Sequence, residues 1–151
     1  MKRQEPVLIG WTEYVDLPDW GVKNIRAKID TGARSSALHV ENIEEKSGWV
    51  RFDVIARRTS RDRVTHVRTR VARRSRVRSS NGAIETRLFV KTRLRLGPVE
   101  RDIEVSLVDR GKMIHRMLLG RTALHGPFLI DVNRRMLLTP KKRKKDHGRA
   151  R

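Results

Sequence analysis

The sequence predicts a single all-β domain, folded as a closed barrel or a sandwich of short strands. Apolar and polar residues alternate with a period of two in most candidate strands, and turn signals containing Gly, Pro or Asn separate these strands. Only residues 121–125 have a short helical pattern. The 151 residues fit one domain, and a hydrophobic fraction of 37% is enough for a modest core.

The first half of the chain contains four predicted strands. Residues 7–11 form an apolar run, and residues 24–29 place their Ile and Ala side chains on one face. Residues 49–56 and 63–71 both alternate, and the stretch between them is polar. This pattern predicts a hairpin.

The second half of the chain is predicted to form six more strands. They cover residues 74–78, 84–96, 103–108, 117–119, 128–132 and 136–138. Asn81-Gly82 predicts a hairpin with a type I′ turn between the first two, because both central residues of that turn need a positive φ. Gly97-Pro98 predicts the next turn.

Positive charge is abundant and unevenly distributed. The chain has 36 Lys and Arg against 17 Asp and Glu, a formal net charge of +19. Ten of the arginines lie in residues 57–78, which contain one acidic residue, Asp62. A second basic cluster, residues 140–151, has almost no apolar residue. We therefore expect a folded domain over residues 1–139 and a disordered basic tail over residues 140–151.

Composition also excludes several classes of site. The chain has no Cys, so disulfides, Cys-ligated zinc, iron–sulfur clusters and a thiol nucleophile are excluded, and a reducing compartment is expected. No apolar stretch is long enough for a secretory signal or a membrane span. We expect a cytoplasmic protein with no membrane partner.

The segment Asp30-Thr31-Gly32-Ala33 is the candidate for chemistry, because an acidic residue leaves an apolar strand and enters a glycine-containing turn. Alone, this pattern also fits an ordinary Asx turn. It is accompanied by residues 117–124, Met-Leu-Leu-Gly-Arg-Thr-Ala-Leu, in which an apolar strand is followed by Gly120 and Arg121.

Together these segments resemble the retropepsin-like aspartic peptidases, and more closely a bacterial, RimB-like family labelled ATP-dependent zinc proteases. The matching residues are 28–39, Ser80-Asn81-Gly82 with Glu85 and Arg87, and 117–124. The resemblance implies a retropepsin-like closed acid-protease barrel with a flap hairpin and one short C-terminal helix. It also implies that Gly120 and Arg121 support the site.

Zinc and ATP, which the family label suggests, do not fit the sequence. The five histidines include no His-Glu-x-x-His pattern, and no Gly-x-x-x-x-Gly-Lys-Ser/Thr loop is present. We therefore expect neither a metal nor a cofactor.

An aspartic peptidase needs two carboxylates that share one proton. The chain has one Asp-Thr-Gly, and Asp109-Arg-Gly111 lacks the Thr, so Asp30 from each of two copies must form the site in a homodimer. The resemblance implies that Thr31 bonds across the two-fold axis. Gly32 lets its N–H approach the carboxylate, and the small Ala33 leaves room for substrate.

The expected substrate is an acidic peptide or protein. Arg34 follows the catalytic turn and can fork onto a substrate carboxylate. The flap, residues 74–90, carries further basic residues that would enrich an acidic ligand. The candidate substrate-binding residues are Ala33, Arg34, Arg76, Arg78, Ser80, Asn81, Gly82 and Arg87. By family analogy, an oligoglutamate tail is a coherent target.

The alternative is a basic β-barrel that binds RNA or the ribosome without catalysis, through the two basic clusters. Charge favours it. However, no aromatic residue is interleaved in either cluster, although stacking platforms are typical of single-strand binders. A peptidase whose basic tail contacts RNA or ribosomes would combine the two hypotheses.

Overall fold

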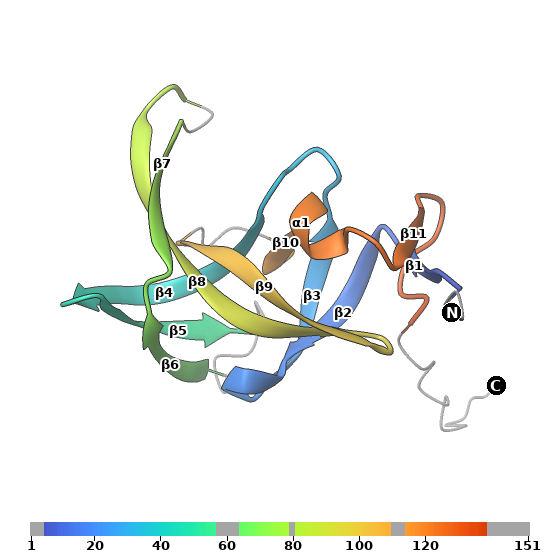
Figure 1. Ribbon diagram of the computed structural model, residues 1–151, viewed down its shortest axis with the longest axis horizontal. Coiled ribbons are helices and arrows are strands. Elements are labelled where there is room, and N and C mark those ends of the chain that lie inside the picture. Colours follow the sequence, from blue (N-terminus) through green and yellow to red (C-terminus); the bar gives the residue numbers. More distant parts are fainter. Residues whose placement is uncertain (1–4, 57–63, 79–80, 110–113, 139–151) are drawn as a thin grey trace.

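The computed structural model describes residues 5–56, 64–78, 81–109 and 114–138, and these residues form an all-β domain (Figure 1), which confirms the predicted class. The elements are β1 (Val7–Gly10), β2 (Thr12–Leu17), a 3-10 turn (Pro18–Trp20), β3 (Val22–Ile29), β4 (Ser36–Lys46), β5 (Trp49–Ile55), β6 (Val64–Arg70), β7 (Arg73–Arg78), β8 (Ile84–Leu96), β9 (Val99–Val108), β10 (Met117–Leu119), α1 (Arg121–Leu124) and β11 (Phe128–Asp131).

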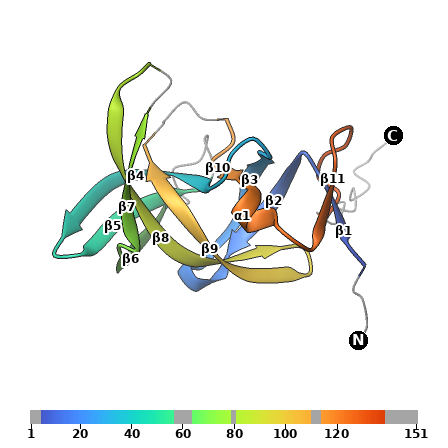
Figure 2. The same cartoon turned by 45° about the horizontal axis from the view of Figure 1, so that its top comes forward.

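Six strands close into a barrel in the order β10-β3-β2-β8-β9-β4. The short strand β10 closes it, because it pairs in parallel with β3 on one side and antiparallel with β4 on the other. β5 and β6 extend the sheet outward from β4, and β1 pairs with β11 in a separate two-stranded sheet. Figure 2 shows these two parts at opposite ends of the molecule.

The core lies inside the barrel and follows the predicted alternation. Ile25, Ala27 and Ile29 of β3 are buried, as the period-two pattern predicted. Leu94 and Leu96 of β8 are also buried in the same core cluster. These side chains hold β3 in place, and β3 ends directly before Asp30.

Two strands were not predicted. Alternation in β2 is hidden because Thr12 and Glu13 are polar and buried. In β4, only the first half is buried, and its pairing with β5 shifts register between Glu41 and Glu44, where Asn42 has a φ of 56°. A period-two pattern therefore does not continue through either segment.

Residues 136–138 were predicted as a strand, and this prediction is wrong. The segment is irregular. The buried Glu13 carboxylate accepts the backbone N–H groups of Leu137 (2.9 Å) and Leu138 (3.1 Å), as well as that of Gly10 (2.7 Å). A side chain thus satisfies the donors that a neighbouring strand would otherwise bind.

The flap hairpin, formed by β7 and residues 84–89 of β8, rises from the barrel (Figure 1) and confirms the predicted hairpin. Its predicted two-residue turn is wrong, since Arg78 pairs with Ile84 and residues 79–83 connect the strands. The hairpin between β5 and β6 and the turn at Gly97-Pro98 are confirmed. The expected basic tail, residues 140–151, lies outside the described residues.

Candidate active site

The Asp30 loop, residues 30–35, begins where β3 leaves the barrel beside β10. The Asp30 N–H donates to the carbonyl of Leu119 (2.9 Å), which fixes the start of the loop to the barrel. The Asp30 Oδ1 accepts the N–H of Gly32 (3.0 Å). A Cβ at position 32 would lie 3.3 Å from this oxygen, so glycine suits the close approach of backbone and carboxylate.

The segment from Gly120 to Thr122 holds the other end of the loop. The N–H groups of Arg121 and Thr122 donate to the carbonyls of Ala33 (2.8 Å) and Arg34 (3.0 Å). The Arg121 guanidinium also donates to the carbonyl of Thr31 (2.9 Å). These bonds explain why two motifs about ninety residues apart in the sequence occur together.

Gly120 is required because the two segments lie very close together. A Cβ on Gly120 would be 2.5 Å from the carbonyl oxygen of Ser35. Its N–H donates to the buried Ser36 hydroxyl (3.0 Å). Gly120 and Arg121, which the resemblance implied as supports of the site, therefore lie directly against the Asp30 loop.

The loop presents one carboxylate on an accessible surface. Asp30 is half-buried, while Thr31 and Gly32 are exposed. One copy of the chain thus offers the Asp30 carboxylate next to backbone that a second molecule can reach. Asp109, in the Asp-Arg-Gly sequence, directly follows the last residue of β9.

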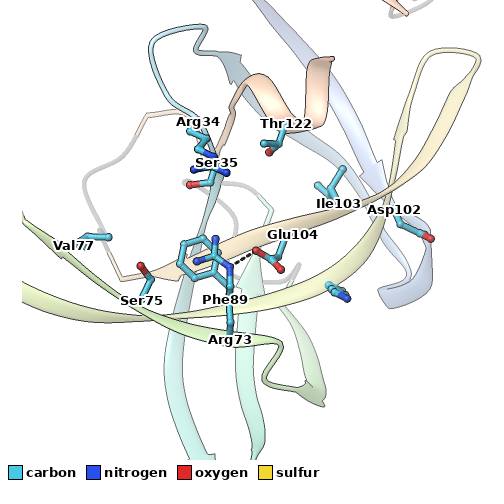
Figure 3. Close-up of a pocket in the computed structure, with 11 residues that line it drawn as sticks. Arg34, Ser35, Arg73, Ser75, Val77, Phe89, Asp102, Ile103, Glu104 and Thr122 are labelled. Atoms are coloured by element: carbon cyan, nitrogen blue, oxygen red, sulfur yellow. Dashed lines mark hydrogen bonds and ion pairs between the residues drawn. The ribbon is translucent and has the colours of Figure 1, made fainter. Parts of the chain in front are cut away.

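An open cavity of about 730 Å³ lies between the flap hairpin, β9, the Asp30 loop and α1 (Figure 3). Its lining residues are Arg34, Ser35, Arg73, Ser75, Val77, Phe89, Lys91, Asp102, Ile103, Glu104 and Thr122. Asp30 itself is not among them, and the Asp30 loop reaches the cavity through Arg34 and Ser35. A peptide lying in it would pass between the loop and the flap.

The cavity contains both charged and apolar groups. The Arg73 guanidinium lies 3.7 Å from the centre of the Phe89 ring, and its Nε donates to Glu104 (2.6 Å), as Figure 3 shows. Asp102 pairs with Arg93 (3.1 Å). Because its acidic residues offset most of its basic ones, the cavity is less basic than the count of arginines in the flap predicted.

The structure separates the flap residues that the sequence grouped together. Arg73, Ser75 and Val77 line the cavity, and alternation along β7 therefore directs Arg76 and Arg78 to the opposite face. Arg87 lies opposite Ser75 on the cavity face, 3.8 Å from Glu85.

At the flap tip, Asn81 and Gly82 are exposed, and Ser80 lies outside the described residues. The lining residues that sequence reasoning missed are Ser35, Ser75, Val77, Phe89, Lys91, Asp102, Ile103, Glu104 and Thr122. The period-two pattern of the two flap strands could have identified Ser75, Phe89 and Lys91, because they share a face with Arg73.

Comparison with known proteins identifies the family of the chain. Residues 8–141 match the model of the family "RimB-like: Retropepsin-like aspartic endopeptidase RimB". Proteins named "Probable alpha-L-glutamate ligase" from Shewanella halifaxensis and Desulfotalea psychrophila are each 36% identical over 128 residues, which is 82% of this chain. The chain spans only 28% of the length of these relatives.

A crystal structure of a Legionella pneumophila protein of unknown function is also similar. Its TM-score is 0.71 at 26% identity, and the match covers 87% of this chain and 98% of that one. Within the described residues, no helix is long and apolar enough to cross a membrane. The Asp30 loop and its Gly120–Arg121 support both lie within the matched residues. Because the family model matches most of its length, the chain belongs to the RimB-like family of retropepsin-like aspartic endopeptidases.

Proposed function

We propose that two copies of the chain form an aspartic endopeptidase, with one Asp30 carboxylate from each copy. The observation that carries this proposal is the Asp30 loop, in which Gly32 donates to the carboxylate while Arg121 holds the Thr31 carbonyl. The loop is thus held in one conformation before substrate binds, as catalysis requires. A single copy supplies half of the carboxylate pair that the chemistry needs.

In this mechanism the two Asp30 carboxyl groups share one proton, because like charges at short distance cannot both ionise freely. The ionised carboxylate removes a proton from water, and the water oxygen forms a bond to the substrate carbonyl carbon. The protonated partner donates to the carbonyl oxygen. The C–N bond then breaks as the departing nitrogen receives the proton taken from water. A hydroxyl of the intermediate returns a proton to the partner carboxylate, which restores the pair.

The substrate of this proposed enzyme is an acidic, glutamate-rich peptide. Arg34 and Lys91 line the cavity, and neither forms an ion pair within the described ranges. They are therefore available for substrate carboxylates. The relatives named for α-L-glutamate ligation contain a segment similar to this chain, so this type of domain occurs in proteins that handle glutamate.

The test of catalysis is Asp30→Asn, which keeps the shape of the side chain and removes its charge. Asp109→Asn is the matched control, since Asp109 belongs to the second Asp-x-Gly sequence of the chain. With fluorogenic peptides containing a run of Glu, we expect Asp30→Asn to lower kcat by at least about 100-fold and Asp109→Asn to leave it unchanged. Equal activity of the parent and Asp30→Asn would overturn the proposal.

Mixing the two proteins tests the shared site. Every mixed dimer of parent and Asp30→Asn contains one carboxylate and is inactive, so activity should fall with the square of the parent fraction. A linear fall would show that each copy acts alone. Replacing Glu by Gln in the peptide tests the acidic preference separately, and unchanged kcat/KM would contradict it.

A further inference from the structure

The outer sheet formed by β5, β6 and the end of β4 carries a Trp–Arg cluster away from the candidate active site. The guanidinium carbons of Arg68 and Arg70 lie 4.0 Å and 4.6 Å from the centre of the Trp49 ring. Trp49 pairs with Arg70 across the sheet, and Arg51 pairs with Arg68, so the four residues share one face. Both Arg68 and Arg70 are exposed.

Charge on this face is only partly balanced. Arg51 donates to Glu44 (2.9 Å), and His66 contacts Asp53 (2.5 Å). Arg68 and Arg70 contact the Trp49 ring, and neither has an ion pair with any residue that the structure describes. Lys46 lies opposite Trp49 where β4 pairs with β5. It is a third exposed cation that forms no ion pair with a described residue.

We propose that this Trp–Arg face binds single-stranded nucleic acid. Guanidinium N–H groups form bidentate bonds with phosphate oxygens, and their planar faces, like that of Trp, stack on bases. Contact with the Trp49 ring orders the two arginines before a ligand binds, which lowers the entropic cost of binding. A strand of nucleotides uses both the cations and the aromatic surface, whereas an acidic peptide uses only the cations.

The same spacing of arginines elsewhere in the fold provides a comparison. Arg93 and Arg95 are also two residues apart on one strand, about 6.7 Å by the rise of a β-strand. They lie against carboxylates, with Arg93 close to Asp102 (3.1 Å) and Arg95 close to Glu100 (3.6 Å). Two arginines on a strand are therefore common to both places, and the Trp ring with unbalanced charge distinguishes the proposed site.

The proposed site is separate from the Asp30 loop. β4 starts beside that loop and continues for 11 residues to Lys46. At the usual rise per residue this is about 30 Å along the strand. Figure 1 shows the end of β4 and the start of β5 projecting from the barrel on the side away from β1 and β11. Nucleic acid can therefore occupy this face while the cavity remains open.

The test uses the full chain and fluorescein-labelled oligouridylate in an anisotropy titration over a range of salt concentrations. We expect Arg68→Gln/Arg70→Gln to raise Kd about tenfold and to reduce the salt slope by about 1.4, since a single-strand phosphate contact contributes about 0.7. Trp49→Leu, which keeps every charge, should raise Kd about two- to fivefold. Arg93→Gln/Arg95→Gln removes the same charge and should change Kd little.

Three results would overturn the proposal. The first is that the parent protein does not bind the oligonucleotide, and the second is that both double variants weaken binding equally. The third is that oligoglutamate displaces the labelled RNA as well as unlabelled RNA does. The last result would assign the face to acidic peptides instead. Oligodeoxythymidylate distinguishes the two nucleic acids, because tighter binding of the RNA would require contacts with its 2′-hydroxyl groups. Thermal unfolding of each variant verifies that it is folded.

Discussion

Gly120→Ala tests directly whether the Asp30 loop depends on its close contact with the segment that precedes α1. The added Cβ would lie 2.5 Å from the carbonyl oxygen of Ser35, 2.7 Å from its carbonyl carbon and 2.9 Å from the Ala33 oxygen. All three are backbone atoms, so no side chain can rotate away. The φ of Gly120 is −91°, which Ala adopts easily, and the effect therefore comes from crowding alone.

The expected loss of stability follows from these contacts. Overpacking against fixed atoms costs about 1–3 kcal/mol. Separating the two segments would also weaken the bonds from Gly120 N–H to Ser36 and from Arg121 N–H to Ala33, at about 1 kcal/mol each. The lower entropy of the unfolded Ala chain returns about 0.4–1 kcal/mol. We expect a net loss of about 3 kcal/mol and a Tm lower by about 6–12 °C.

Gly10→Ala is the matched control for this experiment. A Cβ there would lie 2.6 Å from the carbonyl oxygen of Arg134, again a backbone atom, and the Gly10 N–H donates to Glu13 rather than to the Asp30 loop. Calorimetry should show a lower Tm for both variants, whereas only Gly120→Ala should also lose peptidase activity per folded molecule. An unchanged Tm for Gly120→Ala would refute the packing argument, and equal activities of the two variants would refute the link to catalysis.

Two further predictions concern buried and half-buried titratable groups. Glu13→Gln should lower the free energy of unfolding by about 2–4 kcal/mol in urea denaturation, because an amide cannot accept all three backbone N–H groups that the carboxylate accepts; an unchanged midpoint would contradict this. Burial, with Arg26 and Lys28, lowers the pKa of His115 from its ordinary value of 6.5. Below pH 6.5 the unfolded chain therefore binds a proton at His115 more readily than the folded chain, so the free energy of unfolding falls as the pH is lowered toward the folded pKa. His115→Gln should flatten this part of the plot of unfolding free energy against pH. Parallel plots for the parent and the variant would contradict the prediction.

Strands that bury one regular face were predictable from the sequence, and strands that bury polar side chains were not. Ile25, Ala27 and Ile29 alternate because β3 has one face in the core. In β2, the buried Glu13 interrupts the alternation, because its carboxylate binds the backbone N–H groups of nearby Gly10 and of distant Leu137. No local pattern encodes a partner more than a hundred residues away in the chain.

The candidate site was likewise predictable from the sequence only in part. The sequence indicated the Asp30 loop and the Gly120–Arg121 segment separately, and their resemblance to a known family linked them. The hydrogen bonds show why the link holds, since the two segments complete each other's backbone bonding. The sequence argued against nucleic-acid binding because no aromatic residue is interleaved in either basic cluster, and Trp49 lies outside both clusters. Pairing of β5 with β6 nevertheless places its ring against Arg68 and Arg70.

Charge on a β-strand is divided between two faces, and this decides what the arginines of the flap can do. Arg73 faces the cavity, where Glu104 already balances it, while Arg74 on the other face pairs with Glu45 at the end of β4. Arg76 and Arg78 follow Arg74 on that outer face. An acidic substrate in the cavity would therefore meet Arg34 and Lys91 at short range, and the outer arginines would act on it only through a field that salt screens. The proposed preference for acidic peptides therefore depends on Arg34 and Lys91, and not on Arg74, Arg76 and Arg78 of the flap.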